Sequence, residues 1–179
     1  MNYQTVLDFW FSAATQPLWF AKSDDFDQKI RDQFAQTLEQ AKQCELYNWR
    51  ETAEGRLAEI IVLDQFSRNL YRDQAASFAQ DPLALSLAQE TIQLGLDTKL
   101  RPEQRSFLYM PFMHSESGLI HEVALQLFEK LGNPINLDFE KKHKAIIDRF
   151  GRYPHRNHIL GRQSSPEEIE FLKQPNSSF

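Results

Sequence analysis

A short basic segment, residues 149–162, holds the residue types best suited to binding an anion. It contains four arginines and two histidines and no acidic residue. The whole chain has a formal net charge of -5, so the remainder of the chain carries -9. Guanidinium groups present planar pairs of N–H donors that fit phosphate or carboxylate. The segment therefore either binds an anionic ligand or is held by acids of the same chain.

Its candidate polar residues are Arg149, Arg152, His155, Arg156, Asn157 and Arg162. Of these, Arg152, His155, Arg156 and Asn157 are the candidate ligand-binding residues. The competing interpretation is structural, because these arginines can tie a loop to acidic helices or satisfy carbonyls at the end of a helix. We favour the structural interpretation for the segment as a whole, and we expect Arg152 and Arg156 to be the members that bind a ligand.

A second polar group lies inside an apolar helical stretch, residues 54–72, whose apolar residues surround most of the helix. It consists of Asp64, Gln65, Arg68 and Asn69. Asp64 and Arg68 are four residues apart and can pair along the helix, which buried charges require. Asp64 is interpreted as part of a structural network, whereas Arg68 and Asn69 are candidate ligand-binding residues.

A third group follows the apolar run from Phe107 to Met113, in which Pro111 is expected to kink the helix. Its members His114 and Glu116 are the candidate catalytic residues, because a histidine and a carboxylate in one pocket can act as acid and base. Ser115 lacks the Gly-x-Ser-x-Gly context of a hydrolase nucleophile.

Metal and cofactor sites are not predicted. A site formed by His114, Glu116 and His121 would lack the His-Glu-x-x-His spacing of zinc enzymes. His143 lies on an apolar helix face and is interpreted as a core residue. Neither glycine-rich phosphate-binding motif occurs, so no nucleotide cofactor is expected.

The spacing of apolar residues predicts helices along the chain and no strand. The expected helices cover residues 3–11, 23–46, 54–72, 81–93, 102–113, 119–131 and 138–150, with a short one after the capping box Ser165–Glu168. The fold class is therefore all-α. We expect a single domain over residues 1–179, with about seven or eight helices in antiparallel hairpins and a frayed end over the last five residues.

Composition excludes several classes of function. The isoelectric point near 5.5 argues against a nucleic-acid partner. No apolar run reaches 18 residues, and no signal peptide is evident, so we expect no membrane partner and a cytoplasmic location. The single cysteine, Cys44, cannot form an internal disulfide.

Three spaced motifs resemble those of the bacterial family called domain of unknown function 924. They are Leu63-Asp-Gln-Phe-Ser-Arg-Asn69, Met110-Pro-Phe-Met-His-Ser-Glu116 and Phe150-Gly-Arg-Tyr-Pro-His-Arg-Asn157. Weaker matches from Leu7 to Glu168 extend the resemblance over nearly the whole chain. The resemblance implies an all-helical fold similar to tetratricopeptide-repeat hairpins, although no fixed-period repeat is visible here. It implies no particular reaction.

Two functions from different classes follow. The first is binding of a small anionic metabolite in a polar cleft, with acid–base chemistry by Glu116 or His114. The cleft would be lined by Arg68, Asn69, His114, Glu116, Arg152 and Arg156. The alternative is a helical scaffold that binds a protein or peptide partner through an exposed patch around Trp19 and Phe20, with the polar motifs structural.

Overall fold

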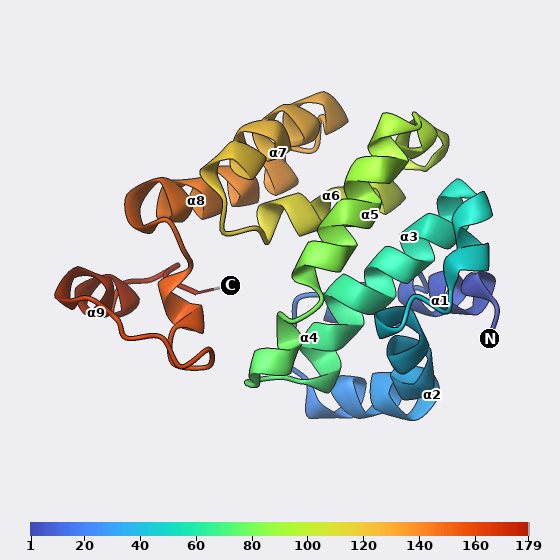
Figure 1. Cartoon of the computed structure of the whole chain (residues 1–179), viewed down its shortest axis with the longest axis horizontal. Helices are drawn as coiled ribbons and strands as arrows, with labels where there is room; N and C mark the ends of the chain where they lie inside the picture. The colour runs from blue at the N-terminus through green and yellow to red at the C-terminus, as the bar shows by residue number, and fades with distance from the viewer. Residues whose placement is uncertain (179) are drawn as a thin grey trace. The chain divides into compact units, whose positions relative to one another are not determined.

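The computed structural model describes residues 1–178, and over this range it confirms the all-α prediction, with helices and turns and no strand (Figure 1). Its α-helices are α1 (Tyr3–Trp10), α2 (Asp24–Lys42), α3 (Ala53–Ile61), α4 (Ser67–Leu70), α5 (Asp81–Gln93), α6 (Pro102–Met113), α7 (Gly118–Leu131), α8 (Pro134–Phe150) and α9 (Pro166–Leu172). A π-helical turn, Val62–Phe66, joins α3 to α4. These three segments form one continuous helix, so the described residues contain eight separate helices.

The chain forms two compact units. Unit 1 contains residues 1–72 and 76–111, and unit 2 contains residues 73–75 and the chain from Phe112 onward. The border between them crosses α6 beside Pro111, the residue that the sequence marks as an interruption of this helix. The single domain expected from the sequence stays a prediction.

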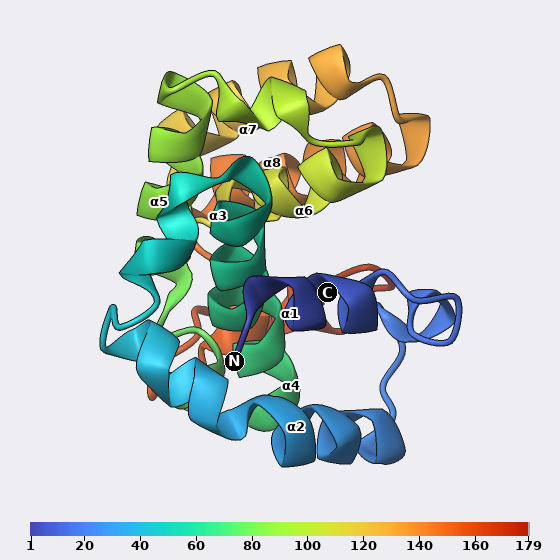
Figure 2. The same ribbon diagram turned by 90° about the vertical axis from the view of Figure 1, so that its right-hand side faces the viewer.

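Unit 1 is built around the continuous α3–α4 helix. Its side chains are buried on nearly every side, as the apolar pattern of residues 54–72 predicts. Helices α1 and α5 contact α3, and α2 contacts α4 and the π-helical turn (Figure 2). Of the second polar group, Asp64, Gln65 and Asn69 are therefore buried in this unit, and Arg68 is half-buried.

An aromatic cluster joins the N-terminal segment of unit 1 to α6. The ring of Trp19 meets that of Phe107 edge to face, with centroids 4.7 Å apart. Trp10 contacts Phe107 and Phe66 in the same manner, at 5.5 and 5.6 Å. Aromatic pairs of this geometry stabilise a core beyond the area they bury. Trp19 therefore packs against α6, whereas Phe20, the other residue of the expected exposed patch, is 76% exposed.

Unit 2 is built on the α7–α8 hairpin (Figure 1). Gly132 ends α7 in the left-handed region, with φ of 75°, and the side chain of Asn133 caps α8. A core of Ile146, Ile147 and Tyr153 forms on α8 and the segment after it, with Phe150 and Phe171 packed against it. The helical turn Pro154–Arg156 contacts α9.

Two expected helix boundaries were wrong, each because a local conformation overrides the apolar pattern. Helix α2 ends at Lys42 rather than near residue 46, since the exposed Cys44 takes a positive φ of 58°. Helix α8 begins four residues before Asp138, because Asn133 supplies the cap. Helix α5, by contrast, has the expected bounds, Asp81–Gln93. The fraying expected over the last five residues stays a prediction, and Phe179 lies outside the described residues.

Candidate functional site

The π-helical turn places the second polar group. Arg68 donates to the side chain and the carbonyl of Asp64, at 3.2 and 2.7 Å. It also makes a two-pronged ion pair with Asp81, at 2.8 and 2.9 Å. The pairing of Asp64 with Arg68 that the sequence suggests is therefore present. The carboxylate of Asp81, the first residue of α5, binds the guanidinium of Arg68.

Asn69 belongs to a neighbouring cluster that ties α4 to α2. Its amide nitrogen donates to Asp27 at 2.8 Å, and Arg72 donates to both oxygens of the same carboxylate, at 2.5 and 2.7 Å. Asn69 is buried, and Asp27 lies on the inner face of α2. Arg68 and Asn69 are thus held by acids of unit 1, and their role in ligand binding stays a prediction.

Glu116, a candidate catalytic residue, accepts three hydrogen bonds in unit 2. Arg162 donates to both of its oxygens, at 2.6 and 2.8 Å, and the backbone N–H of Tyr153 donates at 2.7 Å. Burial opposes ionisation of Glu116, but the hydrogen bonds from Arg162 and Tyr153 outweigh it and lower its pKa. An ionised Glu116 can accept a proton from a bound molecule. In this structure its carboxylate binds Arg162 and the backbone N–H of Tyr153, so it fixes the basic segment in place.

Arg152 is paired with the acid that begins α9. Its guanidinium donates to both oxygens of Glu168, at 2.7 and 2.8 Å, and to the carbonyl of Gln163 at 2.9 Å. Glu168 also forms the predicted capping box with Ser165. The hydrogen bond from Arg152 is the main cause that lowers the pKa of Glu168 to about 2. Arg152 therefore fixes α9 to the basic segment.

The remaining candidates of the basic segment surround Tyr153. The guanidinium of the buried Arg156 lies 4.5 Å from the centroid of the Tyr153 ring, and the His155 ring lies 5.6 Å from it. Asn157 is buried and bonds to Ser164 and to Arg162, at 3.0 and 2.9 Å. His114 is half-buried and, like His155 and Arg156, has an interaction partner. Ligand binding by these residues stays a prediction.

A fully buried histidine–glutamate pair in unit 2 was missed by sequence reasoning. His121 Nδ1 lies 2.7 Å from Glu140 Oε1, and His121 Nε2 lies 2.9 Å from the carbonyl of Ser115. A carbonyl only accepts, so Nε2 carries a proton. Burial raises the pKa of Glu140, the hydrogen bond with His121 opposes that rise, and the second carboxylate oxygen has no partner among the described residues.

The spacing of buried residues on α7 and α8 could have indicated this pair from the sequence. His121 falls in register with Ala124 and Phe128 on α7, and Glu140 with His143 on α8. His143 itself is buried and lies 2.8 Å from the carbonyl of Phe139, as expected for a core residue. Burial lowers its pKa to about 3, so it is neutral at pH 7. A helical wheel of both helices would have placed them together.

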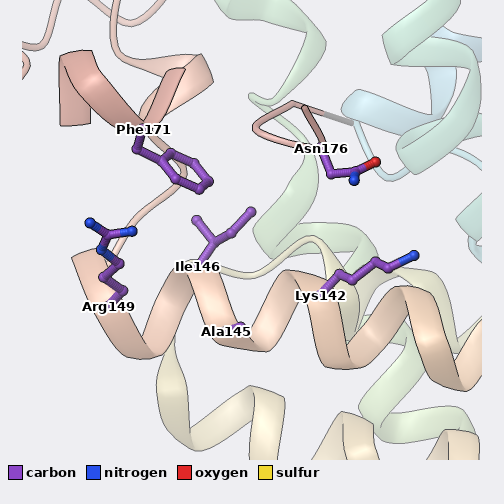
Figure 3. Close-up of a pocket in the computed structure, with 6 residues that line it drawn as sticks. All are labelled: Lys142, Ala145, Ile146, Arg149, Phe171 and Asn176. Carbon is purple, nitrogen blue, oxygen red and sulfur yellow. The ribbon is translucent and has the colours of Figure 1, made fainter. Parts of the chain in front are cut away.

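A pocket of about 270 Å³ opens beside α8 in unit 2 (Figure 3). It is lined by Lys142, Ala145, Ile146, Arg149, Phe171 and Asn176. Ile146 and Phe171 give it an apolar floor and wall, while Lys142 and Arg149 bring two positive charges and Asn176 an amide. Small-molecule sites combine an apolar lining with a few polar groups in this way. Arg149 belongs to the basic segment, whereas sequence reasoning did not single out the other lining residues.

The two cations of the pocket have acid partners at the surface. Lys142 lies 2.7 Å from Asp138, and Arg149 donates twice to one oxygen of Glu167, at 2.8 and 2.9 Å. The side chains of Asp138 and Glu167 are 60% and 63% exposed. Ion pairs this exposed contribute about 0–1 kcal/mol, so a ligand can replace their acids at small cost.

The described residues contain no group of three or more metal-ligating side chains, and no helix among them is long and apolar enough to cross a membrane.

The fold and its polar motifs define a class of all-helical bacterial proteins. The chain belongs to the family described as bacterial protein of unknown function (DUF924), whose sequence profile matches residues 6–176. The predicted family membership is confirmed.

A solved structure supports the same relationship. A protein of unknown function from Agrobacterium tumefaciens is 38% identical in sequence and superimposes with a TM-score of 0.91. The alignment covers 96% of each chain. No curated protein matches the sequence.

Proposed function

We propose that this protein binds a small organic anion, and that the α8 pocket is the binding site. The observation that carries the proposal is that Lys142 and Arg149 line one pocket together with the apolar side chains of Ile146 and Phe171. The cations attract the anionic group, and the apolar surface favours a ligand with a hydrocarbon body. The proposed ligand is a small anion, as the sequence predicts. Its proposed site, however, contains Arg149 rather than Arg152 and Arg156.

The guanidinium of Arg149 is the main recognition group in this proposal. It stacks over Phe150 at 4.7 Å and faces Phe171 at 5.7 Å from the ring centroids. Stacking holds the planar donors in place, so less side-chain entropy is lost when a carboxylate binds. A ligand that also covers apolar surface gains about 25 cal/mol per Å² buried, which the surface carboxylate of Glu167 cannot match.

Acid–base turnover by Glu116 or His114 is a separate proposal, as is the protein-binding scaffold. The scaffold would use Phe20, the most exposed aromatic side chain of the N-terminal segment. Neither is needed for the pocket to bind a ligand, so each can fail independently of it.

Titration of ¹⁵N-labelled protein with hexanoate and benzoate, followed by NMR, tests the binding proposal. Inorganic phosphate serves as a probe that carries charge without an apolar body. We expect saturable shifts confined to the amides of residues 142–149 and 171–176, stronger with the two carboxylates. Arg149→Gln should weaken binding about tenfold or more, because it removes the charge that the anion meets.

Lys141→Gln is the matched control. Lys141 lies on the same helix and carries the same charge but does not line the pocket. Binding should be unchanged in this variant at constant ionic strength, since only a general charge effect would reach it. Shifts spread over the surface, or equal affinities in the two variants, would refute the proposed site.

A further inference from the structure

The two cations of the α8 pocket are separated along the helix. Lys142 and Arg149 are seven residues apart, which is about 10 Å along the axis. They lie on one face because seven residues complete nearly two turns. Ala145 and Ile146 lie between them, so the positive ends are divided by apolar surface. A compact anion such as phosphate can meet one of these ends but cannot span both.

The two ends of the pocket also differ in chemistry. Figure 3 shows Arg149 and Phe171 at one end and Lys142 and Asn176 toward the other. At the first end a planar guanidinium stacks on an aromatic ring, which suits a carboxylate bound side-on. At the second end an ammonium group and an amide are available. The amide comes from a residue held in the left-handed region, with φ of 60°.

The chain end that carries Asn176 is fastened to α9. The buried Ser177 donates its hydroxyl to the carbonyl of Leu172 at 3.1 Å. This bond closes the turn after α9 and keeps Asn176 beside the pocket. Asparagine adopts the left-handed conformation more readily than most residues, so the turn presents this amide with little strain.

The protein's own acids already show which groups the two ends accept. Each cation holds one carboxylate in the described structure, Asp138 at Lys142 and Glu167 at Arg149. A ligand with a carboxylate at each end would replace both acids and lay its hydrocarbon chain over Ala145 and Ile146. Once one end is bound, the second binds as an intramolecular step at high effective concentration.

From this arrangement we infer that the ligand class is a medium-chain α,ω-dicarboxylate, with about six to nine carbon atoms to span two helical turns. The inference rests on the proposed function and names its ligand. It requires both cations to act together, whereas binding of a simple organic anion requires only one.

A chain-length series separates the two claims. The dicarboxylates from malonate to sebacate are titrated by NMR against monocarboxylates of the same carbon number, at constant ionic strength. We expect affinity to rise with length, to peak in the middle of the series, and there to exceed the matched monocarboxylate about tenfold. Lys142→Gln should remove this advantage, so that a dicarboxylate then binds no more tightly than the monocarboxylate of the same carbon number. Lys141→Gln should change neither.

Equal affinity for dicarboxylates and monocarboxylates, or no dependence on length, would overturn the two-ended site and leave the proposed function standing. A length optimum that survives in Lys142→Gln would also overturn it, because the second contact would then lie elsewhere. Absence of binding by every carboxylate would sink the proposed function itself. Arg149→Gln should weaken both series, which locates any observed binding in the pocket.

Discussion

The α8 pocket and the polar network around Tyr153 both take arginines from the same basic segment, yet they use them differently. In the pocket, Arg149 pairs with Glu167, and both side chains are about half exposed or more. In the network, Arg162 pairs with Glu116, with each side chain 25% exposed and with Tyr153 bonded to the same carboxylate. The second pair closes a loop, whereas the first lies on the surface.

This difference teaches that burial of the acid decides what an arginine can do. A carboxylate that is half-buried and bonded to backbone N–H groups stays ionised and keeps its arginine, because breaking the pair leaves an uncompensated charge. A carboxylate in water exchanges easily, since water and salt screen the attraction. Arg149 can therefore serve a ligand, while Arg152 and Arg162 hold the fold of unit 2.

The largest expected loss of stability comes from disrupting the buried pair of His121 and Glu140, which belongs to the same unit as the polar network. Glu140→Ala removes the partner of His121 Nδ1 and leaves a cavity between α7 and α8, so it should destabilise the protein by about 3 kcal/mol. Urea denaturation followed by circular dichroism measures the loss. Glu140→Gln retains a side chain of similar size that can hydrogen-bond to His121 Nδ1, so it should lose much less.

Glu129→Ala is the control for that experiment, since Glu129 is an exposed glutamate near the end of α7. Its free energy of unfolding should change by no more than about 0.5 kcal/mol. If Glu140→Ala were as stable as this control, the buried pair would not support the network.

The next effect separates the two arginines directly. Arg162→Gln leaves Glu116 half-buried without its two-pronged partner, so we expect a loss of about 2 kcal/mol. Arg149→Gln should change stability by no more than about 0.5 kcal/mol, because its ion pair is exposed. Both are measured by urea denaturation at pH 7. Equal losses would erase the distinction between the pocket and the network.

The helices were predictable because their signals are local. The capping box at Ser165 and the apolar stretch of residues 54–72 each depend on neighbours in sequence, and both are confirmed. The π-helical turn was not predicted, since one extra residue in a helical turn leaves no mark on an apolar pattern. The start of α8 was misplaced because Asn133 and Asp138 are both good caps and sequence alone does not choose between them.

The partners of the candidate site residues were less predictable. The sequence indicates that arginines of the basic segment meet acids, but not that Arg152 meets the buried Glu168 while Arg149 meets the exposed Glu167. These two glutamates are adjacent in sequence, and only the direction of α9 separates their environments. The sequence did not indicate a binding role for Lys142, because a lysine on a charged helix face is common. A pocket arises from packing, which spacing does not reveal.

The smallest effect uses pH to sharpen the contrast between these adjacent glutamates. The pKa of Glu168 in the folded protein is about 2, below its usual 4.5, so its carboxylate stabilises the fold fully above pH 4.5. This contribution is lost as the pH falls from 4.5 toward 2. The free energy of unfolding of the wild type relative to Glu168→Gln should therefore shrink by about 1 kcal/mol between pH 6 and 3, less than full linkage because water screens Arg152.

Comparison of the wild type with Glu168→Gln also cancels the effect of a second acid-sensitive group, His143. The pKa of His143 is lowered to about 3 by burial, so the unfolded chain takes up a proton below about pH 6.5 that the folded protein refuses. His143 therefore destabilises both proteins equally as pH falls, and the difference between them isolates Glu168. Glu167→Gln should differ little from the wild type at any of these pH values, since its ion pair is exposed. A difference that shrinks on acidification for Glu167→Gln and not for Glu168→Gln would reverse the assignment of the two arginines.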